Sequence, residues 1–281
     1  MHPHMQDRLQ DQRYELKYWL EESQALRVRQ FVQSQLTLDE FSARQPDLSY
    51  PTLSLYLDSG GLETYWHTIS GNKNRYKLRL RYYDDQPHTP VFFEIKRREN
   101  NVILKQRAGV KKSAVRVLLA GHLPAPEYLL NPHDAEGMFA LQQFCHHVQE
   151  LRAGPKMHIA YVREAYENPG DNSVRVTFDR RVESAPHHHD ALVARSPSPH
   201  LVFGRTVILE LKYTGRFPNW FRELVQTFNC MQEGAAKFAA GIYEKGQQWA
   251  LQPHSPERLL EEFLSAENFP GLFGSSHPLF A

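Results

Sequence analysis

Cysteine, long apolar runs and a surplus of either charge are scarce or missing in this chain. Its two cysteines, Cys145 and Cys230, allow at most one disulfide and form no CxxC metal pair, which favours reduced thiols in a cytosolic protein. No run approaches the roughly 18 apolar residues that a membrane span needs. The first residues also lack the apolar core of a secretory signal. These absences predict a soluble, cytoplasmic protein without a membrane span.

The charges are almost balanced, with 33 Lys and Arg against 32 Asp and Glu. Proteins that coat nucleic acid usually carry a strong overall excess of basic residues, so we expect no nucleic-acid partner. The glycine-rich loop and lysine of P-loop kinases are also absent. Any anion site in this chain must therefore arise from local sorting of charge.

One stretch sorts its charges completely. From Arg75 to Tyr83 the sequence reads Arg-Tyr-Lys-Leu-Arg-Leu-Arg-Tyr-Tyr. At the two-residue period of a β-strand, one face carries four cations: Arg75, Lys77, Arg79 and Arg81. The other face is aromatic and aliphatic. Four like charges on one strand face repel one another, so this face indicates a bound anion.

Other predicted strands repeat this pattern with charges of both signs. The polar faces hold Arg13, Glu15 and Lys17; Glu94 and Lys96; Lys105 and Arg107; Tyr161 and Arg163; Arg175, Thr177 and Asp179; and Glu210 and Lys212. A single such face could simply be solvated. Because the opposite faces are bulky and apolar, we expect helices to cover them and the charged faces to point inward. The predicted fold is α+β: a closed antiparallel β-barrel with peripheral helices.

The periodicity also predicts where the elements lie. Strands are expected at 13–20, 52–58, 75–83, 91–98, 102–110, 157–166, 173–179 and 206–213, and helices at 21–38, 62–69, 134–151, 220–228, 233–243 and 256–266. Residues 39–49 are expected to form a loop. The predicted organisation is a flexible N-terminus at 1–12, a tunnel domain at 13–250 with a surface loop insertion at 184–200, and a C-terminal helix and irregular tail at 251–281.

Three glutamates stand among the predicted inner cations. Glu15, Glu94 and Glu210 each precede a lysine by two residues on the same strand face. Carboxylate oxygens are good ligands for Mg²⁺ or Mn²⁺, which often bridge a protein to substrate phosphate. Internal salt bridges with the neighbouring lysines are the alternative, and the two roles can fall to different glutamates.

Six short segments, in order, resemble one known family. They are Arg13-Tyr-Glu-Leu-Lys-Tyr18, Ser54-Leu-Tyr-Leu-Asp58, Lys77-Leu-Arg-Leu-Arg-Tyr82, Phe93-Glu-Ile-Lys96, Leu209-Glu-Leu-Lys212 and Lys237-Phe with Gly241. Together they resemble the vacuolar transporter chaperone (VTC) domain, the polyphosphate polymerase branch of the CYTH-like triphosphate tunnel metalloenzymes. The resemblance runs from about Arg13 to Tyr243 and implies a barrel whose tunnel binds triphosphate.

The resemblance also implies an activity and a site. The γ-phosphate of ATP would pass to a growing polyphosphate chain, with Mn²⁺ or Mg²⁺ present. By motif position, Lys17, Arg79, Arg81, Lys96, Arg163, Arg175, Lys212 and Lys237 would act in catalysis; Arg75, Lys77, Lys105, Arg107 and Tyr161 would bind phosphate; and Glu210, with Glu94 and Glu15, would hold the metal. No protein nucleophile is required, because phosphoryl transfer asks mainly for positioning and charge neutralisation.

Two positions depart from the family pattern. Ala236 stands where the polymerases commonly carry a serine before the helical lysine, and Thr68 stands where an extra arginine can occur. Beside the polymerase, two further functions stay open, because no motif specifies whether phosphate or water attacks. One is metal-dependent hydrolysis of a triphosphate or nucleoside triphosphate, and the other is binding of polyphosphate without catalysis.

Overall fold

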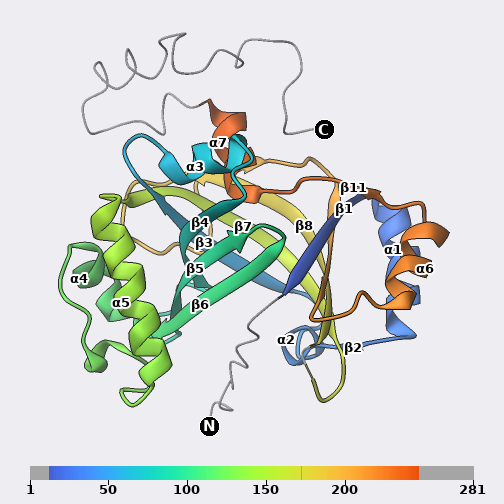
Figure 1. Cartoon of the computed structure of the whole chain (residues 1–281), viewed down its shortest axis with the longest axis horizontal. Coiled ribbons are helices and arrows are strands. Elements are labelled where there is room, and N and C mark those ends of the chain that lie inside the picture. The colour runs from blue at the N-terminus through green and yellow to red at the C-terminus, as the bar shows by residue number, and fades with distance from the viewer. Residues whose placement is uncertain (1–12, 172, 247–281) are drawn as a thin grey trace.

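One large antiparallel sheet dominates the computed structural model, which describes residues 13–171 and 173–246 (Figure 1). Its strands are β1 (Tyr14–Leu20), β2 (Thr37–Leu38), β3 (Tyr50–Asp58), β4 (Asn74–Tyr82), β5 (Val91–Glu99), β6 (Val102–Val110), β7 (Gly154–Glu167), β8 (Val174–Pro186), β9 (His200–Leu201), β10 (Val207–Tyr213) and β11 (Met231–Gln232). The spatial order is β11-β1-β10-β8-β7-β3-β4-β5-β6, with β2 on β7 and β9 on β8.

Helices surround this sheet on several sides (Figure 1). The α-helices are α1 (Glu22–Gln33), α2 (Glu40–Ala43), α3 (Glu63–Ile69), α4 (Val115–Leu119), α5 (Ala135–Glu150), α6 (Asn219–Thr227) and α7 (Lys237–Lys245), with 3₁₀ turns η1 (Lys112–Ala114) and η2 (Pro126–Tyr128). In Figure 1, α4 and α5 lie on one side, α1 and α6 on the opposite side, and α3 and α7 over one end. The predicted α+β class with peripheral helices is confirmed.

The apolar strand faces pack outward against these helices. Leu78 and Leu80 of β4 and Phe93 of β5 join one core with Leu141 and Phe144 of α5, at the helical spacing that the sequence showed. On the opposite side, the outer faces of β8 and β10 share a second core with α1 and α6. Because the apolar faces are used outward, the charged faces of the same strands are left to line the concave side.

The sheet curls until its two ends approach each other. β1 lies near one end of the strand order and β6 lies at the other, yet Arg13 and Ile103 form an antiparallel bridge. The Ile103 amide donates to the Arg13 carbonyl oxygen at 2.9 Å. Within the described residues the β1–β6 seam has this isolated bridge and no ladder. The predicted antiparallel sheet is confirmed. The predicted closure into a barrel is not, because the described strands form an open order whose ends meet at one isolated bridge.

Several predicted boundaries are corrected by short elements. The helix predicted at 21–38 ends at Gln33, because Thr37 and Leu38 pair with β7 as strand β2. The loop predicted at 39–49 contains α2, which Asp39 caps by accepting from the Ser42 amide. The sequence also did not predict α4 or β11. β7 matches its predicted range within three residues, whereas β8 continues to Pro186, well beyond its predicted end at 179.

The loop predicted at 184–200 is less superficial than expected. Residues 184–186 continue β8, and Ser184 pairs with His200 of β9. Ser196 is buried, with its hydroxyl 3.0 Å from Nδ1 of the buried His158. The segment therefore packs partly onto the sheet, and the prediction of a loop that lies wholly on the surface is wrong.

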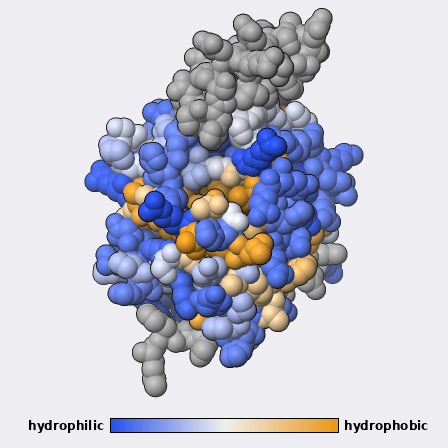
Figure 2. Space-filling model, turned by 90° about the vertical axis from the view of Figure 1, so that its left-hand side faces the viewer, coloured by the Kyte–Doolittle hydropathy of each residue, from blue (hydrophilic) through white to orange (hydrophobic). Residues whose placement is uncertain are grey.

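The outer surface has one apolar region on the side of α4 and α5. Figure 2 shows apolar residues gathered near the middle of this otherwise hydrophilic face. Exposed large side chains in α5 and in the segment before it are Leu123, Leu130 and Phe139. No helix in residues 13–171 and 173–246 is long and apolar enough to cross a membrane. The predicted segment at 1–12 and the predicted C-terminal helix and tail lie outside the described residues.

Candidate functional site

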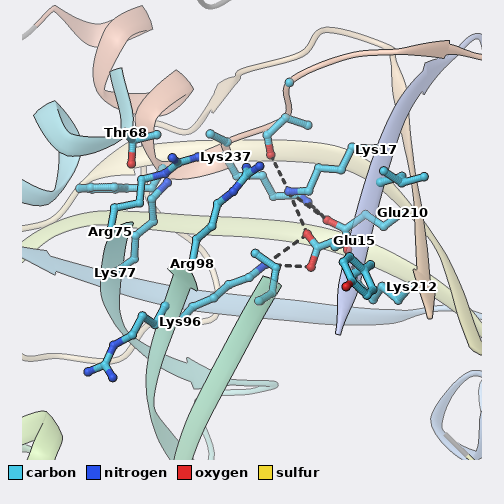
Figure 3. A pocket seen from close by; sticks show the side chains of 18 of the residues that line it. Glu15, Lys17, Thr68, Arg75, Lys77, Lys96, Arg98, Glu210, Lys212 and Lys237 are labelled. Atoms are coloured by element: carbon cyan, nitrogen blue, oxygen red, sulfur yellow. Dashed lines mark hydrogen bonds and ion pairs between the residues drawn. The ribbon is translucent and has the colours of Figure 1, made fainter. Parts of the chain in front are cut away.

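A cavity of about 770 Å³ opens within the concave side of the sheet. Its basic lining residues are Lys17, Arg75, Lys77, Arg79, Arg81, Lys96, Arg97, Arg98, Arg163, Lys212 and Lys237, and its acidic ones are Glu15, Glu210 and Glu233. Figure 3 shows that these side chains come from strands on both sides of the cavity and from α7. A chain whose formal net charge is only +1 therefore has a strong local excess of cations in one cavity.

The structure brings most of the predicted site residues together. Those that line the cavity are Glu15, Lys17, Arg75, Lys77, Arg79, Arg81, Lys96, Tyr161, Arg163, Glu210, Lys212 and Lys237. Four predicted residues do not line it: Glu94, Lys105, Arg107 and Arg175. The strand alternation located the first set because it identifies which face a side chain takes. It does not show which of these side chains reach the cavity, since Glu94, Lys105 and Arg175 lie directly opposite the lining residues Arg79, Lys96 and Lys212.

Glu210 is the centre of the acidic part of the cavity. Its carboxylate lies 2.6 Å from Lys212 Nζ, 3.0 Å from Lys237 Nζ and 3.1 Å from an Arg163 nitrogen. Lys17 Nζ lies slightly farther away, at 3.5 Å. Burial favours the neutral acid, but these cations, led by Lys212, outweigh it and hold the pKa of Glu210 well below its ordinary value. Glu210 is thus an ionised carboxylate in contact with cations.

Asp179 is a second buried carboxylate beside this cluster, and the sequence analysis did not assign it to the site. It accepts a bidentate pair from Arg163 at 2.7 and 2.8 Å and lies 2.7 Å from Lys237 Nζ. Burial lowers the pKa of Lys237, but Asp179 and Glu210 outweigh it and raise that pKa above its ordinary value. Lys237 therefore stays charged, held at the start of α7. The face shared by Arg175, Thr177 and Asp179 was the available signal.

Glu15 joins the two sides of the curled sheet. Its carboxylate accepts from Lys96 Nζ of β5 at 3.0 and 3.1 Å and lies 3.2 Å from Lys17 Nζ on its own strand. Burial again favours the neutral form, yet Lys96 and Lys17 hold the pKa of Glu15 well below its usual value. This contact connects β1 to β5 across the concave side.

Three predicted residues outside the lining, Glu94, Arg107 and Arg175, form salt bridges. Glu94 accepts from Arg79 at 2.6 Å and lies 3.3 Å from Arg107. Arg175 donates to Asp39 at 2.6 Å and to Glu167 at 3.2 Å, so it is tied to the segment that caps α2. Phosphate contacts by Arg107, Lys105 and Arg175 and metal binding by Glu94 stay predictions.

On the side of the cavity formed by β4 and β5, three cations have no such compensation. Arg75 lies directly opposite Arg98, and Lys77 lies opposite Lys96. Among the described residues, no carboxylate lies within ion-pair distance of Arg75, Lys77 or Arg98. Burial lowers the pKa of Lys77 to about 7, and nearby cations add to this effect.

Tyr56 is a lining residue that the sequence analysis quoted in a motif but gave no role. Its ring stacks on Phe238 of α7 at 4.9 Å, and its hydroxyl accepts from Arg79 at 3.1 Å. Burial raises the pKa of Tyr56, but Arg79, Arg81 and Lys77 outweigh it and lower the pKa to about 7. Its place on the inner face of β3, among bulky apolar neighbours in sequence, hid it among core residues.

The two cavity carboxylates provide the donor type that a hard divalent cation prefers. Mg²⁺ is commonly held by one or two carboxylates together with substrate phosphates. Glu15 and Glu210 approach the same cation, Lys17 Nζ, at 3.2 and 3.5 Å, so a positive charge can lie between them. No group of three or more His, Cys, Asp or Glu side chains in metal-binding range occurs in residues 13–171 and 173–246. Glu15 and Glu210 are carboxylates of the kind that can hold a divalent cation together with phosphate oxygens.

The chain is similar in sequence to one protein family and to a curated relative. Residues 12–244 match the family described as the VTC domain. A curated relative, "Vacuolar transporter chaperone complex subunit 2" of Schizosaccharomyces pombe, is 22% identical over 269 residues. The alignment covers 80% of this chain and 36% of that protein, so the chain spans about a third of the relative's length.

Two solved structures are similar at low identity. A Bacillus halodurans protein described as a candidate adenylate cyclase has a TM-score of 0.47 and 13% identity, covering 80% of this chain and 94% of its own. A Pyrococcus horikoshii protein has a TM-score of 0.42 and 10% identity, covering 83% and 99%. Both TM-scores are below 0.5, and no statement about this chain follows from them. The family match spans most of the chain, confirms the resemblance seen in the motifs, and shows that this protein belongs to the VTC domain family.

Proposed function

We propose that this chain transfers the γ-phosphate of ATP to the end of a growing polyphosphate chain inside the cavity. One observation carries the proposal: eleven Lys and Arg side chains line the same cavity as three glutamates. Such an excess is costly without a counter-anion, since buried charges need partners. Arg and Lys suit phosphate oxygens, by bidentate contact and by point charge respectively. Membership of the VTC domain family supports the same substrate class.

The residues of the chain would act mainly by positioning and charge neutralisation. Lys17, Lys212 and Lys237 surround Glu210. Arg79 and Arg81 of β4 line the same cavity. Phosphates held between these two groups would be aligned for transfer. An oxygen of the acceptor's terminal phosphate attacks the γ-phosphorus, the bond to the β–γ bridging oxygen breaks, and ADP leaves. No side chain needs to form a covalent intermediate.

Glu210, assisted by Glu15, would hold Mn²⁺ or Mg²⁺ in this account. The metal would neutralise phosphate charge and help to orient the reacting groups. Lys17 and Lys212 already contact these carboxylates, so their ammonium groups would turn toward phosphate oxygens when a polyanion enters. The same two carboxylates would thus contact lysines without ligand, and a metal ion bound to phosphate when ligand is present.

A binding module without catalysis is the second candidate. It is favoured by the pairing of the glutamates, because Glu15, Glu94 and Glu210 all contact Lys or Arg. If those salt bridges persist with ligand bound, the cavity would hold polyphosphate but would not bind metal.

One incubation distinguishes these functions. Purified protein is mixed with ATP and Mn²⁺, and in parallel with Mg²⁺, and the phosphate products are resolved on a gel. The polymerase predicts a ladder of polyphosphate together with ADP. Orthophosphate without polymer would indicate a triphosphatase, and intact ATP with retained polyphosphate binding would indicate the binding module.

A further inference from the structure

The cavity has two parts that differ in charge. In one part the cations contact glutamates, and the other part includes Arg98, which is not among the predicted site residues. We infer that Arg98, together with Arg75 and Lys77, forms a separate subsite for the part of a polyphosphate chain beyond the reacting phosphates. The inference rests on the proposed function and deepens it, because it assigns long-chain polyphosphate as the ligand and names the strands that hold it. Neither the motifs nor the family match assigned Arg98 a role.

The first observation is the register of β4 and β5. Arg75 faces Arg98 and Lys77 faces Lys96 as directly opposed pairs in the antiparallel ladder. Like charges in such positions destabilise a sheet. Glu15 offsets the charge of Lys96 in the second pair, whereas no carboxylate among the described residues lies within ion-pair distance of Arg75 or Arg98. The uncompensated Arg75–Arg98 pair therefore favours a bound anion at this end of the ladder.

The second observation is what these cations contact. The Arg75 guanidinium donates to the Asn72 carbonyl oxygen, and Arg98 donates to the Asn100 carbonyl oxygen at 2.7 Å. Lys77 has an aromatic ring as its neighbour, with Nζ 5.9 Å from the centre of Phe238. Burial lowers the pKa of Arg75, and the charge of Arg98 lowers it further. In the described chain no carboxylate offsets these three charges.

The other half of the cavity behaves in the opposite way. There, Lys17, Lys96 and Lys212 each lie within 3.2 Å of Glu15 or Glu210. Figure 3 shows Arg75, Lys77 and Arg98 on one side, and Lys17, Glu15, Glu210 and Lys212 on the other. Carboxylates suit the half where a metal and the reacting phosphates meet. A half with cations alone suits a polyanion that is held but not transformed.

The part of the cavity that contains Arg75, Lys77 and Arg98 also borders the turn between β5 and β6. Arg97, Arg98, Asn101 and Ile103 line the cavity, and Glu99 and Asn100 between them are exposed. The lining therefore runs from Arg81, which is buried, to a turn at the surface. A polyphosphate longer than the reacting phosphates can follow this path toward solvent, whereas tripolyphosphate can bind without reaching Arg98.

The test compares two ligands on two variants. Calorimetric titration with tripolyphosphate and with long-chain polyphosphate is done on the wild type, Arg98→Gln and Arg116→Gln. Arg116 on α4 is 89% exposed in its side chain and is matched in charge change. We expect Arg98→Gln to weaken long-chain binding about tenfold, the scale of a lost charge-assisted contact. Its tripolyphosphate affinity should change less than about twofold, and Arg116→Gln should change neither.

Three outcomes overturn the inference. Equal weakening of both ligands would place Arg98 in the triphosphate site, no weakening would remove it from any site, and an equal effect of Arg116→Gln would show nonspecific charge attraction. These binding data need no turnover. A wild type that makes no polymer but shows the expected Arg98 effect would therefore contradict the polymerase and leave the subsite intact.

A melting experiment guards against a folding artefact. Without ligand, Arg98→Gln removes a like-charge pair and should raise the melting temperature by about 1–3 °C. The stabilisation by long-chain polyphosphate should become smaller in the same variant. Arg98→Lys keeps the charge and should retain most of the long-chain binding. A lower melting temperature for ligand-free Arg98→Gln would show that Arg98 serves the fold, which would contradict the subsite.

Discussion

Glu210 is the residue on which the charge balance of the cavity depends. Glu210→Gln keeps the shape of the side chain but leaves Lys212, Lys237 and Arg163 short of one negative charge. Breaking a buried ion pair in this way typically costs about 3–5 kcal/mol, and the isosteric amide should bring the loss toward about 2–4 kcal/mol. We expect the ligand-free variant to melt earlier, to lose phosphoryl transfer and to bind tripolyphosphate at least as tightly. Melting curves, product gels and calorimetry measure the three effects.

Glu233→Gln is the matched control for this prediction. Glu233 lines the same cavity, but within the described residues it has no Lys or Arg at ion-pair distance. Its replacement should leave stability and turnover nearly unchanged. If Glu210→Gln lost polyanion binding together with turnover, the proposed metal-ligand role of Glu210 would be wrong.

Lys77 and Tyr56 should make the anion affinity of the cavity depend on pH. The pKa of each is lowered to about 7, by burial for Lys77 and by the cations around Tyr56 that outweigh its burial. As the pH rises through 7, Lys77 loses a positive charge and Tyr56 gains a negative one. Both changes oppose an anion, so tripolyphosphate affinity should fall between pH 6.5 and 8.5 by about three- to tenfold.

Lys77→Arg tests the origin of this slope, because arginine stays charged over the whole range. Calorimetry at several pH values should give a shallower fall in affinity for this variant than for the wild type. An affinity that rises with pH in the wild type would contradict the assignment of these two groups.

The sequence predicted which residues line the cavity better than it predicted which of those residues contact one another. Alternation placed Lys77, Arg79 and Arg81 on one face of a strand, and all three line the cavity. It could not show that Glu210 meets Lys237 from a helix far along the chain. It also could not show that Arg175 is directed to Asp39 instead of the cavity. Such contacts depend on the curl of the sheet, which no local period encodes.

Among the helices and strands, α7 connects the packing of the fold to the cavity most directly. It begins at Lys237, and Ala236 at its N-cap provides no side-chain hydrogen bond. Ala236→Ser should cap the helix and stabilise the protein by about 0.5–1 kcal/mol. If the missing hydroxyl also limits synthesis, polymer yield should rise. Melting and product gels check both effects, with Ala240→Ser inside the helix as the control that should give neither gain. Unchanged melting for Ala236→Ser would show that the cap adds nothing here.

Gly241 lets α7 approach the sheet closely. A Cβ there would lie 2.9 Å from Ser184 Cβ and 3.3 Å from Ile159 Cδ1. Gly241 follows Lys237 by one turn on the same helix face, so a shift of the helix would also move the lysine. Gly241→Ala should cost about 1–3 kcal/mol and reduce turnover.

Ser184→Gly removes the obstructing Cβ and supplies the second half of a double-mutant cycle. The two changes together should destabilise less than the sum of the single changes. Strict additivity in urea unfolding would contradict the proposed contact between α7 and β8.

Long periodic elements were predicted within a few residues, while short ones were missed. α5 and β6 match their predicted positions closely: α5 has an apolar period that extends over many residues, and β6 follows a turn at 99–101 that the sequence marks. β2 and β11 have two residues each, and they exist because β7 and β1 lie alongside them. Such pairing is a product of the tertiary fold, so a local pattern cannot predict it.

The molecule as a whole separates charge by place. The chain is nearly neutral, yet the concave side of its sheet is strongly cationic and its outer faces are covered by helices (Figure 1). The curl of the sheet creates this separation, since it turns the polar faces of distant strands toward one another. The sequence predicted the inward direction from the bulk of the opposite faces. It did not predict that the β1–β6 seam would be joined by an isolated bridge.

The most direct test of the account is an experimental structure of the protein with tripolyphosphate and Mn²⁺. We expect phosphates within hydrogen-bond distance of Lys17, Arg79, Arg81, Lys212 and Lys237. We also expect a metal on Glu210, with the present Lys212–Glu210 contact of 2.6 Å broken or lengthened. Phosphates bound outside the cavity, or an intact lysine–glutamate network with no metal, would contradict it.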